Sequence, residues 1–306
     1  MKHQRGAAIL VAMLVVTLVA TLAAGLQWRQ WRMLQSEAAT RAQSQASWVL
    51  LGALDWARLI LREDARSAGN GGLIDHLGEP WALPLQEVKL SSFLAADSLA
   101  EPGADEAYLS GGIVDAQSKI NLTNLLANQT GESVMSASAL ESLTRLYQQL
   151  HLPVAELKTW TSAWVASSQA NASVPLRPRY VEQLGWLGVP NSSIEILKNY
   201  ITILPERTPV NLNTASSAVI FASVPRIDMA AAQKLVQTRA QVPLQSVSDA
   251  QSLLGISSTF SGTDFSVSSQ YFEVRGRLRL GDWTIEESSL VRRTGLDVST
   301  IWRRRL

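Results

Sequence analysis

Few side chains in this sequence are of the types that carry out catalysis. Cysteine is absent, which excludes thiolate nucleophiles, disulfides and cysteine-ligated zinc. The histidines are His3, His76 and His151, and no two of them have the spacing of metal ligands. Neither His76 nor His151 lies near a serine placed like that of a nucleophile elbow. We therefore predict surface or capping roles for these histidines, and a protein that is not an enzyme.

The acidic residues show no catalytic arrangement either. The adjacent carboxylates Glu63 and Asp64 fall at the end of a predicted helix, and Glu286 and Glu287 fall on a predicted strand face. We expect both pairs to be solvated. Basic residues number 27 and acidic residues 26, for a net charge of +1. This balance disfavours nucleic acid or another polyanion as the main partner.

A long apolar run begins directly after Arg5 and Gly6. From Ala7 to Leu26 the only polar residues are Thr17 and Thr21. A helix of this length, at ~1.5 Å per residue, spans about 30 Å, the thickness of a bilayer's hydrocarbon core. A secretory signal has a shorter apolar region, of roughly 7–15 residues, although the small residues at 22–25 leave a signal-peptide cleavage site as an alternative.

The helical pattern continues beyond the apolar run. No proline precedes Pro80, and apolar residues recur at three- and four-residue steps between Leu34 and Ile60. The sequence therefore predicts one helix over residues 7–64, with residues 7–26 in the membrane and residues 27–64 outside it. Basic residues flank both ends of the membrane segment, so their count alone does not orient it.

A short basic leader that ends in glycine before such a helix resembles the type IV pilin class. The resemblance implies that a prepilin peptidase cleaves after Gly6 and methylates Ala7, with Lys2 and Arg5 as the leader charges. Pilins carry a glutamate five residues after the cleavage site, where this chain has Val11. A carboxylate in hydrocarbon is costly unless it is paired, and in a pilus the terminal amine of a neighbouring subunit pairs with it. Val11 is thus expected in a subunit at the tip, or is simply a lipid-facing residue.

The rest of the chain changes pattern twice. A glycine- and proline-rich loop over residues 65–85 leads to strand-like pieces, among them residues 111–126. Residues 136–254 show helical patterns, including one predicted helix over residues 192–204. Within them, two stretches place Val-Pro before a polar cap and an apolar helix, around Pro190 and Pro225, which predicts two helix–turn–helix units.

Alternating apolar and charged residues after Phe272 predict a β-hairpin with a two-residue turn at Gly281–Asp282. The late strands need partners, so we expect the helical block to be inserted between two halves of one antiparallel sheet. The last residues, Trp302–Leu306, fit a final strand with solvated arginines, a partner-binding tail or a membrane-surface contact.

Five strings along the chain resemble the protein K family of type II secretion systems, the largest of the minor pseudopilins. They are "QRGAAILV", "DHLGEPWA", "IVDAQSKINLTNLL", "PRYVEQL" and "TPVNLNTASSAVIFASVP". The resemblance implies an α+β, type IV pilin-like fold with a large inserted all-helical domain. It also implies a non-enzymatic subunit at the tip of a pseudopilus, which starts or caps the filament and supports protein export across the outer membrane.

The same resemblance sets the expected domains, partners and location. The domains are a leader (1–6), the transmembrane and periplasmic parts of the helix (7–26 and 27–64), a first β region (65–126), the inserted α-domain (127–263) and a second β region (264–306). The expected partners are the I and J minor pseudopilins, with H as a further candidate, the major pseudopilin, the inner-membrane secretion platform and prepilin peptidase. The chain would cross the bacterial inner membrane once, with its N-terminus cytoplasmic and its bulk periplasmic.

Relatives in this family bind calcium through an aspartate-rich stretch of the α-domain. The equivalent residues here, Thr159 to Ser173, contain no acidic residue, and calcium needs six to eight oxygen ligands with two or more carboxylates. We therefore predict no metal site and no cofactor; calcium would require remote ligands such as Glu182 or Asp228.

A DNA-binding role is the alternative function. The string "VIFASVPRIDMAAAQKLVQTR" resembles a helix-hairpin-helix, as in a membrane-anchored DNA receptor of the competence type. Arg226, Lys234 and Arg239 supply positive charge, but the hairpin lacks glycine and carries Asp228, which would repel a phosphate. We favour packing as the role of this unit and expect no nucleic-acid partner.

The processing hypothesis makes a direct prediction. Replacing Gly6 by Leu should block cleavage and leave the whole precursor in the membrane, whereas the native protein should have an intact mass that begins at Ala7, with or without one methyl group. The measurement is mass spectrometry of both proteins purified from membranes. A Gly6→Leu protein that matures normally, or a native protein that retains Met1, would contradict cleavage at this site.

Overall fold

The computed structural model describes residues 5–67, 73–90, 107–129, 132–168, 175–255, 263–281 and 283–306. The chain divides into two compact units, Met1–Gly52 and Ala53–Leu306. Helix α1 (Arg5–Ser67) contributes to both units. It confirms the long N-terminal helix that the sequence predicts, since no proline interrupts it.

In the first unit, α1 is long and apolar enough to cross a membrane, with a mean hydropathy of 2.6 in its most apolar window. The two polar side chains of residues 7–26 are satisfied within the helix, because the hydroxyls of Thr17 and Thr21 donate to the carbonyl oxygens of Leu14 and Leu18 at 2.9 Å. Backbone and hydroxyl groups thus need no water, as a membrane helix requires. This part of α1 fits a membrane anchor.

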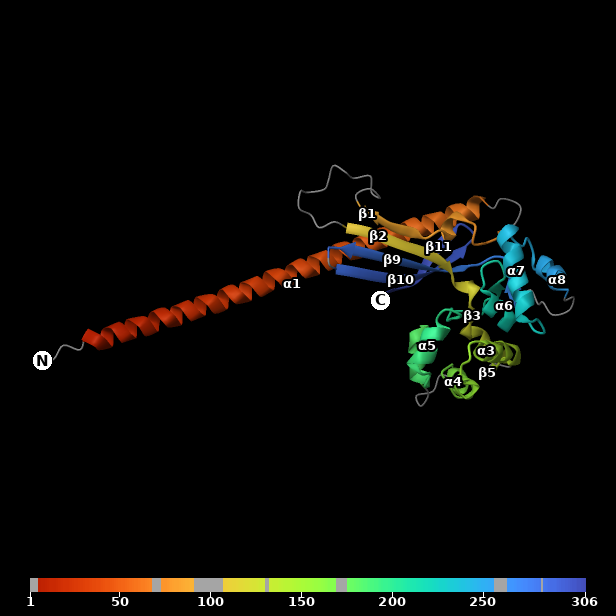
Figure 1. Ribbon diagram of the computed structural model, residues 1–306, viewed down its shortest axis with the longest axis horizontal. Helices are drawn as coiled ribbons and strands as arrows, with labels where there is room; N and C mark the ends of the chain where they lie inside the picture. The colour runs from red at the N-terminus through yellow and green to blue at the C-terminus, as the bar shows by residue number, and fades with distance from the viewer. Residues whose placement is uncertain are drawn as a thin grey trace. The chain divides into compact units, whose positions relative to one another are not determined.

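The second unit contains one five-stranded antiparallel sheet (Figure 1). In spatial order its strands are β1 (Leu85–Lys89), β2 (Ala107–Asp115), β9 (Tyr271–Leu280), β10 (Trp283–Thr294) and β11 (Asp297–Arg305). Strands β2 and β9 are neighbours in the sheet although a long stretch of chain separates them, with Asp115 opposite Phe272. The expected insertion between two halves of one sheet is therefore confirmed.

The predicted hairpin near the C-terminus is also confirmed. Leu280 pairs with Trp283, which leaves a two-residue connection between β9 and β10. Gly281 has a φ of 54°, a conformation that glycine adopts without steric cost. The second residue of the turn, Asp282, lies outside the described residues.

The end of α1 is buried in the second unit. Leu54, Ala57 and Leu61 lie at helical spacing and are all buried. On the same stretch, Arg58 Nε donates to the carbonyl oxygen of Val298 in β11 at 2.8 Å. These contacts hold the last turns of α1 beside the sheet.

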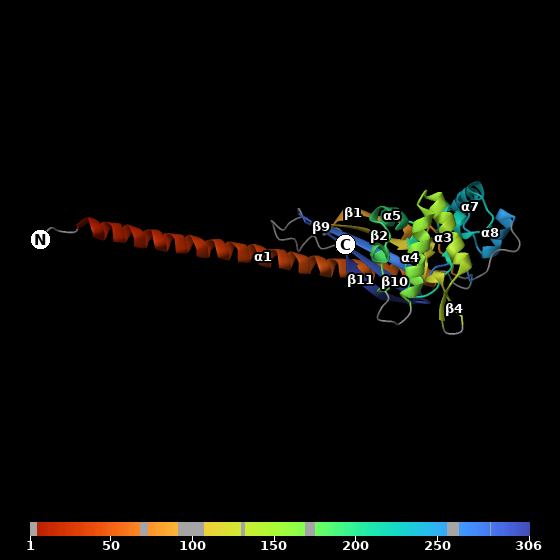
Figure 2. The ribbon, with the colours of Figure 1, turned by 90° about the horizontal axis from the view of Figure 1, so that it is seen from below.

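Six α-helices and one longer 3₁₀ helix lie between β2 and β9 in the described chain. Figures 1 and 2 show the α-helices gathered in one block. These helices are α3 (Ala137–Gln149), α4 (Val154–Ala166), the 3₁₀ helix η5 (Val181–Leu187), α5 (Asn191–Leu197), α6 (Ser217–Ser223), α7 (Met229–Gln241) and α8 (Val247–Leu254). They share one large apolar core, which includes the fully buried Trp160 and Trp164. Trp160 Nε1 donates to the Tyr147 hydroxyl at 2.9 Å, so this buried indole is not left unpaired.

Short strands and 3₁₀ turns lie outside the five-stranded sheet and the helices. The strand pairs are β3 (Ile120–Asn121) with β6 (Ile201–Thr202), β4 (Leu126–Gln129) with β5 (Glu132–Met135), and β7 (Val210–Asn211) with β8 (Phe265–Ser266). The 3₁₀ turns are η2 (Pro80–Ala82), η3 (Ala116–Ser118) and η4 (Leu122–Leu125).

The two predicted helix–turn–helix units are η5–α5 and α6–α7. Their turns contain residues of positive φ, Gly188 at 88° and Arg226 at 63°. The helix predicted over residues 192–204 is wrong beyond Leu197, where α5 ends. Ile201 and Thr202 pair with β3 instead, so a contact with a distant segment overrides the local helical pattern.

Candidate functional site

The predicted processing site lies at the start of α1. Gly6 and Ala7 are in its first turn, Arg5 is its first residue, and Lys2 lies outside the described residues. The side chains of residues 1–7 are likewise outside the description. Val11 lies on α1 with 62% of its side chain exposed, among other exposed apolar residues. Cleavage after Gly6 and the role of Val11 remain predictions.

A buried polar cluster lies where the chain leaves the sheet for the helical block and where it returns. It is built around the carboxylate of Asp115, the last residue of β2. Asp115 Oδ1 accepts from the backbone N–H of Gln117 at 2.7 Å. Asp115 Oδ2 accepts from Asn211 Nδ2 at 3.0 Å, Thr214 Oγ1 at 2.5 Å and Ser269 Oγ at 2.7 Å. One carboxylate therefore joins the exit from β2, the helical block and the approach to β9.

Two amide side chains strengthen the same connection. Gln117 Oε1 accepts from the backbone N–H groups of Gln270 and Tyr271 at 2.6 and 3.2 Å, and Gln117 Nε2 donates to the carbonyl oxygen of Pro209 at 3.1 Å. Asn211 Nδ2 also lies 3.2 Å from the carbonyl oxygen of Asp75. These side chains satisfy backbone groups that have no strand partner at this place.

A buried arginine completes the cluster from the sheet side. The Arg293 guanidinium, on β10, donates to Asp64 Oδ2 at 2.7 Å and to Asp75 Oδ1 at 2.5 Å, and its side chain is 1% exposed. It also donates to the carbonyl oxygen of Ser269 at 3.0 Å and lies 4.8 Å from the ring centre of Phe272. We call Asp64, Asp75, Asp115, Asn211, Ser269 and Arg293 the junction cluster.

The predicted solvation of two carboxylates is wrong. Asp64 is only 10% exposed, because it lies on the buried face at the end of α1 and pairs with Arg293. Glu287 is 12% exposed and accepts from Arg303 Nε at 2.5 Å across the β10–β11 pair. Their neighbours Glu63 and Glu286 are exposed as expected, at 60% and 45%.

The junction cluster holds more negative than positive groups. Burial raises the pKa of Asp115 to about 6, although four donors stabilise its charged form. Burial also raises the pKa values of Asp64 and Asp75, because desolvation outweighs the attraction of Arg293. The cluster thus contains three aspartates and a single guanidinium, and this makes its stability sensitive to pH.

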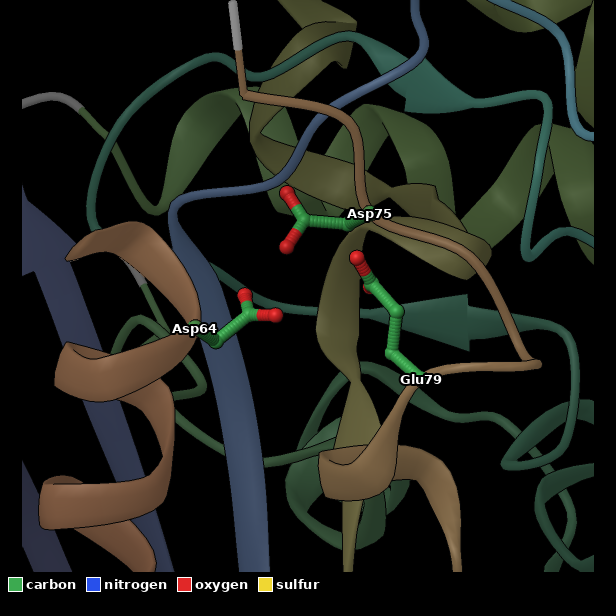
Figure 3. A group of neighbouring side chains, drawn as sticks. All are labelled: Asp64, Asp75 and Glu79. Atoms are coloured by element: carbon green, nitrogen blue, oxygen red, sulfur yellow. The ribbon is translucent and has the colours of Figure 1, made fainter. Parts of the chain in front are cut away.

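Three acidic side chains of this region have the spacing of metal ligands. Asp64, Asp75 and Glu79 bring their carboxylate oxygens within 4.8 Å of one another (Figure 3). Their oxygens already have partners: Arg293 binds both aspartates, and Glu79 Oε2 accepts from Trp81 Nε1 at 2.6 Å. The guanidinium supplies the positive charge that a cation would bring.

The residues present do not fit the calcium site of the family. Residues 159–166 lie in α4 and carry no carboxylate, and residues 169–173 lie outside the described chain. Of the remote candidates, Glu182 accepts from both terminal nitrogens of Arg304 at 2.8 and 2.9 Å. Asp228 caps α7 by accepting from the backbone N–H of Ala231 at 2.8 Å. Glu182 is thus neutralised by an arginine, and Asp228 serves as a helix cap.

The α6–α7 unit lacks the features of a phosphate-binding hairpin. The Asp228 carboxylate occupies the N-terminus of α7, where a phosphate would bind. The predicted contribution of Arg239 to a basic surface is wrong, since Arg239 is buried and donates to the carbonyl oxygens of Leu212 and Ala215. Burial lowers the pKa of Arg239 to about 10. The unit serves packing, and the DNA-binding alternative is not favoured.

Sequence reasoning missed the junction cluster, although three of the family-like strings contain parts of it. Asp75 begins "DHLGEPWA", Asp115 lies in "IVDAQSKINLTNLL", and Asn211 lies in "TPVNLNTA". The sequence offered only the family-like strings themselves, without a pattern that singles out these polar residues. Asn121 is a further example: its Nδ2 donates to the carbonyl oxygen of Glu206 at 2.7 Å, and its Oδ1 accepts from the backbone N–H of Leu204 at 3.1 Å.

Comparisons with known proteins agree with this fold. A family model described as "Type II secretion system (T2SS), protein K" matches residues 210–268. Type II secretion system protein K of Pseudomonas aeruginosa is 27% identical, over 92% of this chain and 86% of the relative. The protein K of Klebsiella pneumoniae is 26% identical, over 99% of this chain and 97% of the relative.

A solved structure is similar as well. One chain of the GspK–GspI–GspJ complex from the type 2 secretion system of enterotoxigenic Escherichia coli matches with a TM-score of 0.65 and 19% identity. The match covers 87% of this chain and 98% of that chain. At this identity the likeness concerns the fold.

The long apolar helix, the antiparallel sheet and the inserted helical block define a pilin-like protein. Within that class, the chain is similar along nearly its full length to type II secretion system protein K. The family resemblance read from the sequence is thereby confirmed.

The junction cluster predicts a large stability difference between two arginines of the sheet. Arg293→Met leaves buried carboxylates without their counter-charge and should lower the free energy of unfolding by roughly 3–5 kcal/mol. Arg277→Met breaks only the exposed pair with Glu286 and should cost about 1 kcal/mol or less. Urea unfolding of the full chain in non-ionic detergent, followed by tryptophan fluorescence, measures both. Equal losses would contradict a central role for Arg293.

A second prediction concerns pH. Asp115 has a folded pKa above its unfolded value of 3.8, so the folded state binds its proton more tightly, and stability should rise as the pH falls from about 7 to 4. A shift from 3.8 to about 6 corresponds to about 3 kcal/mol across this window. In Asp115→Asn the slope of unfolding free energy against pH should become shallower, whereas Asp55→Asn, at an exposed position, should keep it. An unchanged slope in Asp115→Asn would overturn this assignment.

Proposed function

We propose that this chain is a minor pseudopilin that acts at the tip of a type II secretion pseudopilus, where it initiates or caps the filament and supports export across the outer membrane. The observation that carries the proposal is its similarity to protein K over more than nine-tenths of its length, on a pilin-like fold. The role is one of assembly, and it needs no catalysis.

The apolar part of α1 makes assembly obligatory. Its side chains are widely exposed between Ile9 and Leu26, so lipid covers them while the subunit is in the membrane. When the subunit leaves the bilayer, each Å² of this surface costs about 25 cal/mol in water. Helices of neighbouring subunits must therefore replace the lipid, and the filament forms around them.

Two features support the tip position. Val11 stands where pilins have a glutamate, so this subunit has no carboxylate to pair with the terminal amine of a subunit above it. The helical block between β2 and β9 adds bulk that a plain pilin sheet lacks, and this bulk would obstruct a further subunit. Both features oppose growth beyond this subunit.

The partners and location follow from the same proposal. The I and J minor pseudopilins are the first partners, because the similar Escherichia coli chain is part of a GspK–GspI–GspJ complex. The H component, the major pseudopilin, the secretion platform and prepilin peptidase are further partners. The chain crosses the inner membrane once, with its N-terminus in the cytoplasm and residues beyond 26 in the periplasm.

The proposal is tested by gene deletion and complementation in the native host. Deletion should leave secreted proteins in the periplasm, and the intact gene should restore export. Normal export in the deletion strain would rule out the secretion role.

Position 11 provides a sharper prediction for the tip. Val11→Glu should leave folding unchanged, because the side chain is exposed on α1, but it should give this subunit the pairing group of an internal pilin. Crosslinking of assembled filaments should then find the variant below other subunits as well as at the tip. Val11→Leu is the matched control. If the Val11→Glu subunit is still found at the tip alone, Val11 is only a lipid-facing residue.

A further inference from the structure

An open apolar groove lies between the helical block and the last strand of the sheet. It has a volume of about 660 Å³ and is lined mainly by apolar and aromatic side chains, with two arginines at its rim. The apolar members are Leu176, Pro178, Tyr180, Trp186, Ile203, Leu204, Pro205, Ile301 and Trp302. This volume is in the usual range of roughly 300–1,000 Å³ for binding sites.

The groove exposes large apolar side chains to water. Leu176 is 76% exposed, Trp186 54% and Ile301 41%. Ile301 is the extra residue of a β-bulge in β11, since Leu290 pairs with Trp302 and Val291 pairs with Thr300. A bulge in an edge strand redirects a side chain, and here Ile301 becomes part of the groove lining. Exposed tryptophans beside other apolar residues are typical of protein interfaces.

A smaller polar pocket of about 100 Å³ adjoins the groove, and both share Arg179, Tyr180, Ile203 and Trp302 in their lining. Tyr180 and Trp302 meet edge to face at 5.1 Å, and the Arg304 guanidinium lies 4.5 Å from the Tyr180 ring centre. The side chains of Tyr180 and Trp302 therefore separate the groove from the polar pocket and line both of them.

The charges of the polar pocket do not balance. Its acidic side chains have partners already: Glu182 pairs with Arg304, and Glu273 pairs with Arg275. Three further cations line it: Lys198, which pairs with Glu195 outside the pocket, and Lys119 and Arg179. Within the described residues, neither Lys119 nor Arg179 forms an ion pair with a carboxylate, and Lys119 Nζ donates at 2.8 Å to the neutral carbonyl oxygen of Lys198.

The Lys119 ammonium is costly to keep charged without an anion. Burial lowers its pKa; the nearby carboxylates Glu273 and Glu182 raise it and Arg275 lowers it, and the pKa remains below its ordinary value. A carboxylate from another molecule would pair with Lys119 and also face Arg179. This surface thus combines an apolar groove with excess positive charge beside it.

We propose that this groove, together with the adjoining polar pocket, binds a segment of a second protein that carries a large apolar side chain close to an acidic residue. The apolar side chain would pack between Trp186 and Ile301, and the carboxylate would reach Lys119 and Arg179. A membrane surface fits less well, because Lys119 lines a small pocket that a single carboxylate can enter but a flat layer of headgroups cannot. The inference does not depend on the proposed secretion function.

The experiment uses the full chain in non-ionic detergent and random peptides displayed on phage. The chain contains no cysteine, so Leu176→Cys allows an environment-sensitive bimane dye to be attached at one site in the groove. Selected peptides should combine an aromatic or aliphatic residue with Asp or Glu, and their synthetic forms should shift the dye emission to the blue. Replacing the acidic residue by its amide should weaken their binding about tenfold.

Variants of the chain separate this site from other exposed residues. Trp186→Ala and Lys119→Gln should each weaken binding about tenfold, whereas Trp283→Ala and Lys234→Gln, at exposed positions outside the groove, should leave it unchanged. Thermal unfolding of each variant confirms that the fold is kept.

Two outcomes would overturn the proposal. The first is selected peptides that lack acidic residues, or whose binding survives Trp186→Ala or Lys119→Gln. The second is a dye emission that no selected peptide shifts, but that does shift when the chain is transferred from detergent into phosphatidylglycerol nanodiscs. Transfer into phosphatidylcholine nanodiscs would cause no shift. That result would assign the surface to anionic lipid instead of a protein segment.

Discussion

The interaction on which the rest of this structure depends is the burial of Arg293 among carboxylates from distant parts of the chain. Its guanidinium joins Asp64 at the end of α1 to Asp75 in the following segment, and its donation to Ser269 reaches the entrance of β9. From there, hydrogen bonds lead through Asp115 to the helical block. A protein without cysteine cannot crosslink these elements covalently, so buried charge performs that task. The arrangement is costly to desolvate, which is why the carboxylates depend so strongly on one partner.

Asparagine side chains extend this organisation into the helical block, where regular strand ladders are only two to four residues long. The Asn213 amide donates to the carbonyl oxygen of Leu244 and accepts from the N–H of Leu244, both at 2.9 Å, as a strand neighbour would. Asn124 does the same with Thr208, at 2.8 and 3.1 Å. Such pairs keep irregular backbone satisfied inside a protein interior. They allow loops to cross the core without exposing it to water.

The sequence was informative where structure follows from local pattern. The uninterrupted apolar run predicted α1, alternation around Gly281 predicted the β9–β10 hairpin, and the unpartnered late strands predicted the insertion. It failed where distant segments decide: α5 stops at Leu197 because β6 pairs with β3, and Asp64 is buried by a residue 229 positions away. The junction cluster could not be foreseen for the same reason, since its members are single polar residues without periodicity. Cleavage of the leader and the role of Val11 depend on a peptidase and on neighbouring subunits. The fold of a single chain therefore does not test them.

The direct pairing of β2 with β9 has a consequence for how the chain folds. In the topology of the sheet, the whole helical block is a long connection between β2 and β9. Its two ends lie one strand spacing apart, about 4.8 Å. The entropy of closing such a loop grows only with the logarithm of its length, but the closure must precede any pairing of the two central strands. Once the helical block has folded, it brings Asp115 and Ser269 together. The pairing of β2 with β9 would then follow the folding of the inserted block, which positions the ends of both strands.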